Sequence, residues 1–495
     1  MNILQDLFYG FSVAFHPINA LACFVGVFIG TLIGVLPGIG PVGAMSILLP
    51  VTFGLSPVAG IIMLAGIYYG ASYGGSTTSI LVNIPGEAAS VVTCLDGNQM
   101  AKQGRAGPAL GIAAFGSFIA GTLGLVGLMV MAKPLAKFAV AFGPAEYFSL
   151  MCLGLSLITY LTQGSVVKGL AMAGLGLFLS LIGQDIVTGK ARFTFGIYEL
   201  QDGLGLVPLV MGLFGISEVL SNLIRPEERA LLKTKIRHLL PNKEDWRQSA
   251  LPIGRGSLLG FFLGILPGGG AIIASFVSYA VEKRFSRHPE RFGKGAIEGV
   301  AGPESANNSA TSGAFIPLFS LGIPSNVIMA LLLGALMIHG VRPGPLLIME
   351  HPEIFWGTVA SMYVGNIMLL ILNLPLIGLW VKILKIPYRV LFPLILLFCL
   401  IGSYSINYNV FDIFVMIFFG LVGLGFRYLD YEPAPLVLAF VLGPMLEQNL
   451  RQALILSDGS PAIFVTKPLS AACLAVSAFL LFSAVFRLIR KKNKS

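Results

Sequence analysis

Two stretches of the chain share one pattern: residues 26–40 read GVFIGTLIGVLPGIG, and residues 256–270 read GSLLGFFLGILPGGG. In both, glycine recurs at every fourth position and the stripe ends in Leu-Pro-Gly. Glycine at this spacing leaves one face of a helix smooth, so that a second helix can approach closely. Proline then breaks the helix. We expect two interrupted helical hairpins, with tips at Pro37, Gly38 and Gly40 and at Pro267, Gly268 and Gly270.

The composition is that of an integral membrane protein. Of the 495 residues, 56% are hydrophobic and only 11% are charged, and the mean hydropathy is +0.85. Soluble domains have roughly 45–50% apolar and about 25% charged residues. No polar stretch between the apolar segments is long enough to form a separate domain. The sequence therefore predicts one all-α polytopic membrane domain over residues 1–495, with the lipid bilayer as its surroundings.

The excess of basic over acidic residues does not indicate nucleic-acid binding. The net charge is +9, from 32 basic and 23 acidic residues, but the basic residues lie in short loops between apolar segments. Such a distribution is typical of the positive-inside rule. The five cysteines form no C-x-x-C pair, which excludes a recognisable zinc or disulfide framework.

Apolar segments of about 20 residues predict about 11–12 transmembrane segments. The clearest lie near 57–83, 108–132, 146–161, 165–183, 204–224, 310–340, 355–381, 390–407, 410–426, 433–449 and 468–488. The longest polar connection, 225–256, is rich in Lys and Arg and is expected in the cytoplasm. A second basic loop follows at 283–294. Because one crossing cannot join two cytoplasmic loops, we interpret 257–280 as a re-entrant hairpin with arms of about eleven residues.

The repeated stretches define two halves of the chain. We expect repeat 1 over 21–224, a basic cytoplasmic linker over 225–256, repeat 2 over 257–449, and a final transmembrane helix with a basic cytoplasmic tail over 468–495. Five spans separate the two hairpins, so the repeats are expected to have inverted topology. Folds of this kind hold their substrate near the membrane midplane, between interrupted helices. A transporter is the function that this arrangement favours, by analogy of fold.

Polar clusters follow each hairpin. The first lies within 70–79 and contains Ser76, Thr77 and Thr78; the second lies within 298–312 and contains Glu304, Asn307, Asn308 and Ser309. Asn83 begins an Asn-Ile-Pro-Gly whose counterpart is Gly-Ile-Pro-Ser at 322–325. Hydroxyls, amides and helix N-termini suit a carboxylate ligand, and Ser, Thr and carbonyl oxygens suit sodium. The alternative is that these hydroxyls only bond their own helix backbone.

Acidic residues within a membrane are costly and are therefore functional candidates. Glu304 is the best of them, with a loop position at the surface as its alternative. A rival function comes from Gly70-x-Ser72-x-Gly74, which matches the nucleophile motif of serine hydrolases. This short motif is weakly specific in a chain with 60 glycines. An enzyme is therefore not the function that we expect.

Longer motifs resemble one known family. They are GTLIGVLPGIGP from Gly30, YGASYGGSTTSILVNIPGEAASVVTCLDGNQMAKQGRAGPAL from Tyr69, GILPGGGA from Gly264 and GVAGPESANNSATSGAFIPL from Gly299. Together they resemble the large permease subunit, called TctA, of the tripartite tricarboxylate transporters. The resemblance covers nearly the whole chain, and the motif from Tyr69 is highly specific.

The resemblance implies a multi-pass permease of the bacterial inner membrane. It implies a small membrane subunit and a periplasmic solute-binding protein as partners, a citrate-like carboxylate as substrate, and a sodium or proton gradient as the driving force, with no further cofactor. Carried over by motif, the substrate and ion positions are the two tips and both polar clusters. Our hypothesis is alternating access, with the tips closing over a carboxylate from opposite sides. A carboxylate- or ion-conducting channel is the main alternative.

Overall fold

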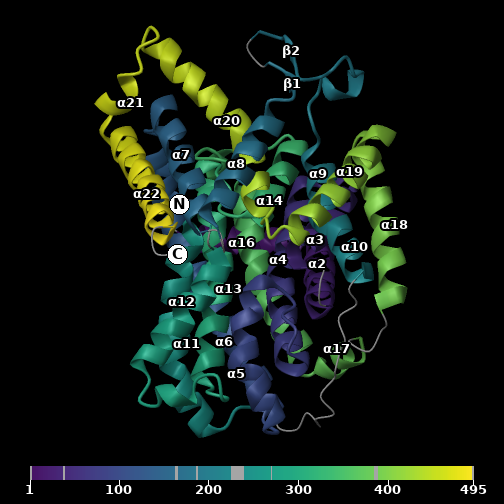
Figure 1. Cartoon of the computed structure of the whole chain (residues 1–495). Helices are drawn as coiled ribbons and strands as arrows, with labels where there is room; N and C mark the ends of the chain where they lie inside the picture. The colour runs from purple at the N-terminus through teal and green to yellow at the C-terminus, as the bar shows by residue number, and fades with distance from the viewer. Residues whose placement is uncertain are drawn as a thin grey trace.

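The structure is a computed structural model that describes residues 3–36, 40–161, 165–185, 188–224, 239–268, 270–383 and 388–492. It is helical almost throughout, which confirms the all-α prediction (Figure 1). Within the described ranges, six helices are long and apolar enough to cross a membrane: Pro17–Val35, Pro57–Val82, Ala106–Ala139, Leu206–Ile224, Pro352–Asn373 and Val410–Tyr428. Shorter apolar helices accompany them. The inverted topology and the full number of spans remain predictions.

The first half of the chain forms ten helices and a two-stranded hairpin within the residues described. They are α1 (Ile3–Ala14), α2 (Pro17–Val35), α3 (Gly40–Leu48), α4 (Pro57–Val82), α5 (Val91–Lys102), α6 (Ala106–Ala139), α7 (Pro144–Leu161), α8 (Val166–Ser180), β1 (Gly183–Gln184), β2 (Ala191–Arg192), α9 (Leu206–Val210) and α10 (Ser217–Ile224). A π-helical turn, Met211–Ile216, joins α9 to α10. Short 3-10 turns lie at Leu49–Gly54, Ala88–Ser90 and Tyr198–Leu200.

The second half is helical in every element that the structure describes. Its helices are α11 (Lys243–Ile265), α12 (Gly270–Phe285), α13 (Glu298–Leu321), α14 (Val327–Ile338), α15 (Leu347–Glu350), α16 (Pro352–Asn373), α17 (Ile377–Ile383), α18 (Tyr388–Asn407), α19 (Val410–Tyr428), α20 (Ala434–Leu456), α21 (Ile463–Thr466) and α22 (Pro468–Lys492). A 3-10 turn lies at Pro289–Arg291. In Figure 1, α22 packs beside α7, although the two helices belong to opposite halves of the chain.

Two boundaries differ from the sequence-based expectation. The stretch 310–340 is not one span, because α13 ends at Gly322, a left-handed residue with φ +71°, and Pro324 follows before α14 begins. The second hairpin also begins earlier than residue 257. Helix α11 starts at Lys243, where Asn242 accepts a hydrogen bond from the backbone N–H of Asp245 (2.8 Å) and Asp245 accepts one from that of Asn242 (3.0 Å). This capping box places the end of the expected linker inside a helix.

Both glycine stripes are used for close packing. A Cβ added to any of the six glycines would lie 2.1–2.5 Å from a backbone carbonyl oxygen of the facing helix, which no side chain can do. On α2, Gly26, Gly30 and Gly34 face Met63, Ile67 and Ala71 of α4; on α11, Gly256, Gly260 and Gly264 face Gly302, Ala306 and Ala310 of α13. The two hairpins therefore pack in the same way, each against the long helix that follows it.

Helices α4 and α13 form the centre of the molecule. Both are buried along nearly their whole length, and α2, α6, α11 and α16 pack around them. The break after each central helix is built alike: α4 ends at Asn83 (φ +63°) and α13 at Gly322 (φ +71°), and an Ile-Pro pair follows each. Asparagine and glycine are the residues that adopt this left-handed cap most readily.

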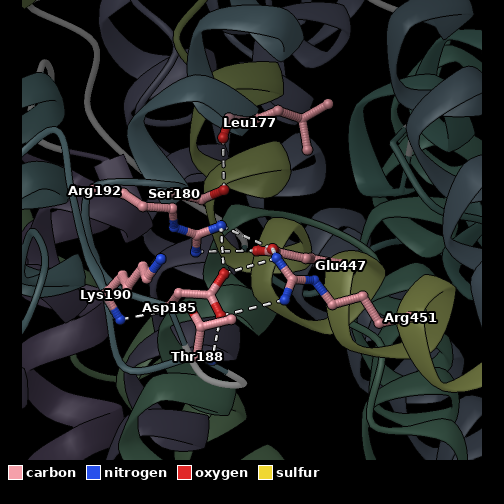
Figure 2. Close-up of polar contacts among 8 residues, drawn as sticks. All are labelled: Leu177, Ser180, Asp185, Thr188, Lys190, Arg192, Glu447 and Arg451. Carbon is pink, nitrogen blue, oxygen red and sulfur yellow. Dashed lines mark hydrogen bonds and ion pairs between the residues drawn. The ribbon is translucent and has the colours of Figure 1, made fainter.

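The β1–β2 hairpin is held against α20 by four charged side chains (Figure 2). Arg192 contacts Glu447 (2.8 Å) and Asp185 (3.3 Å), and Arg451 contacts Asp185 (2.7 Å) and Glu447 (2.6 Å). The hydrogen bond from Arg192 to the Glu447 carboxylate raises the pKa of this guanidinium. Glu447 therefore serves an ion-pair network at the middle of α20, which continues to Leu456.

The glycine stripes give a matched test of packing within one helix. Gly260→Ala is expected to lower stability by about 1–3 kcal/mol, because its Cβ would meet the Ala306 carbonyl oxygen at 2.1 Å. Gly254 lies on the same helix, and no atom of the described residues would lie within 4 Å of a Cβ there, so Gly254→Ala should be neutral or slightly stabilising. The midpoint of thermal unfolding of the purified protein measures both. Equal midpoints for the two variants would contradict the packing account.

Candidate functional site

One cavity of about 400 Å³ lies where both hairpin tips meet. It is lined by the start of α3, the segment 85–89 that follows α4, the tip of the second hairpin, the start of α14 and the start of α20. A cavity of this size is within the range of small-molecule sites. Gly40 of the first tip and Gly268 and Gly270 of the second belong to its wall.

Four helices begin at this cavity. The first residues of α3, α12, α14 and α20 contribute to its lining. The first N–H groups of a helix have no partner within the helix, and the helix dipole places positive potential there. Asn326 caps α14: its Oδ1 accepts a hydrogen bond from the Met329 N–H (2.9 Å), while its Nδ2 donates to the Tyr68 hydroxyl (3.2 Å). The cavity therefore offers several helix N-termini to an anionic group.

The two hairpins contact the segments that follow the central helices α4 and α13. The N–H of Gly268 donates to the Ser325 carbonyl oxygen (2.8 Å), which lies between α13 and α14. In the first half, Gly86 sits against the Gly34 carbonyl oxygen, where a Cβ would lie at 2.0 Å. Gly40, Gly268 and Gly270 have φ of +63°, +96° and +33°, in the left-handed range that glycine adopts most readily. Pro37 and Gly38 lie outside the described residues, and Pro267 precedes the lining residue Gly268.

The side-chain charges of the cavity are mixed. Glu87, Glu218 and Glu432 line it together with Arg427, and Arg427 is ion-paired with Glu218. Among the described residues of the wall, the acidic side chains therefore outnumber the basic one. An anionic ligand in this cavity depends on helix N-termini for attraction and meets like charge from the carboxylates.

Beside the cavity, a buried polar network joins the two halves of the chain. The Glu304 carboxylate, on α13, is 1% exposed and accepts hydrogen bonds from the hydroxyls of Ser76 on α4 and Thr93 on α5. One turn further along α13, the Asn307 amide donates to the Glu87 carboxylate (2.6 Å). Glu304 is thus inside the protein, and the alternative of a surface loop position is wrong.

The remaining predicted residues divide between this network and helix packing. Asn308 donates to the Ser117 hydroxyl (2.7 Å) of α6, and Thr77 lines a small cavity beside it. Thr78 donates to the Val35 carbonyl oxygen (2.7 Å) and Ser309 to that of Ser257 (2.7 Å), so both bind the glycine-striped helices. The side chain of Asn83 is exposed at the end of α4.

Several residues of the site were missed from the sequence. Glu87 and Thr93 fall in the stretch 86–107, which reads as a polar cytoplasmic loop but folds back as α5 against α4 and α13. Asp96, also on α5, is fully buried and accepts from the backbone N–H groups of Gly293, Gly295 and Ala296 at 2.7–2.9 Å. The signal available in the sequence was the long, specific motif from Tyr69, which contains all three residues.

The hydrolase alternative finds no support in the geometry. The nucleophile motif requires a sharp turn from a strand into a helix. Ser72 instead lies in the middle of α4, and its hydroxyl donates to the Tyr68 carbonyl oxygen (3.3 Å), one turn earlier.

Comparisons with known proteins find matches along the whole chain. Residues 20–438 match a family model described as "Tripartite tricarboxylate transporter TctA family". The chain is 52% identical over 493 residues to an Agrobacterium vitis protein named "Uncharacterized 52.8 kDa protein in TAR-I ttuC' 3'region", covering 100% of this chain and 98% of the relative. A second Agrobacterium vitis protein, named for the TAR-II ttuC' 3'region, is 54% identical over 234 residues, which are 47% of this chain and 97% of that relative. No solved structure matches the chain.

The Glu304 network predicts a matched pair of variants. Thr93→Val removes one of the two hydroxyls that donate to the buried carboxylate and is expected to cost about 1–3 kcal/mol of stability. Thr93→Ser keeps the hydroxyl and should lose less. Thermal unfolding of the purified variants measures the difference. If valine is tolerated as well as serine, the hydroxyl does not hold Glu304 in place.

Proposed function

The chain belongs to the tripartite tricarboxylate transporter TctA family, and from this premise we propose that it imports a tricarboxylate or related organic acid by alternating access. It is the large membrane subunit of such a system, a multi-pass transport protein. The proposed driving force is a sodium or proton gradient. The membership argues for a transporter and against an enzyme.

The observation that carries this proposal is the cavity of about 400 Å³ at which both tips and four helix N-termini meet. Carboxylate groups are suited to helix N-termini, because the unpaired N–H groups donate hydrogen bonds and the dipole favours negative charge. The glycine tips allow the ligand to approach the backbone closely. We infer that the carboxylates of the substrate bind at the first turns of α12 and α14.

The equivalent construction of the two halves supports alternating access. Each half packs a glycine-striped helix against a long central helix and ends that helix in a left-handed cap before an Ile-Pro pair. In transporters with inverted repeats, the substrate lies between such interrupted helices and one half moves against the other. In our proposal, the tip that carries Gly40 and the tip that carries Gly268 open alternately, one at a time.

The charges of the cavity support cation coupling. A tricarboxylate that enters beside Glu87, Glu218 and Glu432 meets like charge, because only Arg427 opposes them among the lining residues described. Protons on these carboxylates or a cation bound nearby would offset the repulsion. Co-transport of a cation would therefore lower the electrostatic cost of binding the anionic substrate.

Members of this family work with a small membrane subunit and a periplasmic solute-binding protein. We infer the same two partners for this chain and a location in the bacterial inner membrane.

Uptake of labelled di- and tricarboxylates tests the proposal. Cells that express the chain with its small subunit and binding protein should concentrate one of these acids, and the uptake should stop when the sodium and proton gradients are collapsed. Gly268→Val is expected to abolish uptake, because valine is strained at φ +96°.

Gly254→Val is the matched control, since a Cβ at that glycine would meet none of the residues described by the structure and no positive φ is required. Membrane levels of both variants should equal those of the natural chain. Flux that only dissipates a gradient would favour a channel instead of a coupled transporter. Normal uptake by Gly268→Val would show that the second hairpin tip is not part of the substrate site.

A further inference from the structure

The buried Glu304 has hydroxyl donors but no cationic side chain as an ion-pair partner in the part of the chain that the structure describes. Its carboxylate is 1% exposed and bonds to Ser76 and Thr93, and none of the ion pairs among the described residues includes it. An isolated buried carboxylate is costly unless a cation or a proton compensates its charge. The surroundings of Ser76 show which of the two the structure is built to hold.

A second cavity, of about 10 Å³, lies against Ser76. It is enclosed by α4, α6 and the end of α16, and its lining residues are Tyr73, Ser76, Thr77, Leu110, Ala113, Ala114, Ser117 and Asn373. This volume holds about one water molecule or one small ion. Each of the polar side chains named there carries an oxygen, and the described lining includes no Lys, Arg or His.

Asn373 shows that this cavity is polar by construction. The side chain is 4% exposed, and its Nδ2 donates to the Leu369 carbonyl oxygen (3.0 Å). Its Oδ1 is buried with no hydrogen-bond partner within the described part of the chain. A buried carbonyl oxygen without a partner costs about 1–3 kcal/mol. A ligand that accepts electron pairs would remove this cost.

The hydroxyls of the wall have lone pairs available for such a ligand. Ser76 gives its proton to Glu304, and Tyr73 gives its proton to the Asn366 Oδ1 (2.6 Å). Ser117 accepts the amide proton of Asn308 (2.7 Å). The protons of Ser76 and Tyr73 are therefore committed outside the cavity, and a hard cation is the ligand that these oxygens suit.

We propose that this cavity is a sodium site, with Ser76, Thr77, Ser117 and Asn373 as oxygen ligands and Glu304 as the compensating charge. One carboxylate balances a single positive charge, which favours a monovalent ion, and the small volume favours sodium over the larger potassium. The proposal rests on the proposed function, to which it assigns the coupling ion. Asn373 and Ser117 were not among the residues that the sequence singled out.

The same contacts connect the ion to the substrate cavity. Ser76 joins the small cavity to Glu304, and Asn307, one turn along α13, binds Glu87 in the wall of the large cavity. Sodium at Ser76 would thus fix α13 against α4 and hold Asn307 in place to bind Glu87. This continuous chain of contacts gives a physical route for coupling.

The test is sodium binding by the purified full-length chain, without partners or substrate. At constant ionic strength, replacing choline chloride with sodium chloride should raise the midpoint of thermal unfolding in a saturable way, and potassium chloride should raise it less. Asn373→Leu and Ser117→Ala should each weaken the apparent sodium affinity at least about tenfold. Ser320→Ala is the matched control, because its hydroxyl donates to the Ala132 carbonyl oxygen (3.1 Å), outside the cavity wall.

Identical midpoints in sodium and choline for the natural chain would overturn the site, whatever the variants do. A midpoint that responds to pH and not to sodium would assign the compensating charge to a proton on Glu304 and would equally overturn it. An unchanged sodium affinity in both cavity variants would place the ion elsewhere. Because the readout needs no transport, sodium binding without uptake would count against the proposed function and leave the site standing.

Discussion

Close packing of glycine-striped helices determines the rest of this structure. Gly26, Gly30 and Gly34 bring α2 within backbone contact of α4, and the equivalent stripe brings α11 against α13. Each stripe ends in Leu-Pro-Gly. In the second half, the Gly268 N–H donates to the Ser325 carbonyl oxygen beside the break after α13, and in the first half Gly86, after the break that ends α4, packs against the Gly34 carbonyl oxygen. Backbone groups freed at these breaks must line a cavity or be buried in protein. The large cavity is the place where both sets of breaks meet.

A second constraint is the burial of charge. Glu87 and Glu304 belong to opposite halves of the chain, yet α13 connects them. Glu304 lies on α13, and Asn307, one turn further along this helix, donates a hydrogen bond to the Glu87 carboxylate. Neutral donors hold both carboxylates among the described residues, so their negative charge is costly to bury unless a cation or a proton compensates it. The proposed co-transport of an organic anion and a cation would use this arrangement. In that proposal, substrate and ion occupy neighbouring cavities that share one network.

The sequence predicts what depends on local pattern and misses what depends on tertiary contact. The glycine stripes, the tips and the polar clusters repeat along the chain and could be found by reading it. The helical path of α5 could not, because residues 86–107 are polar by local hydropathy and are buried only by packing against α4 and α13. Asn373 likewise becomes a candidate ligand only when α16 meets α4 and α6. The break at Gly322 could have been predicted from Gly-Ile-Pro, but the apolar residues on both sides hid it.

An experimental structure of the chain with a bound tricarboxylate tests the central claim most directly. The account predicts that the ligand lies in the cavity between the tips, with carboxylate groups against the first turns of α12 and α14 and close to Gly268 and Gly270. A ligand bound between other helices, with this cavity filled only by water, would contradict it.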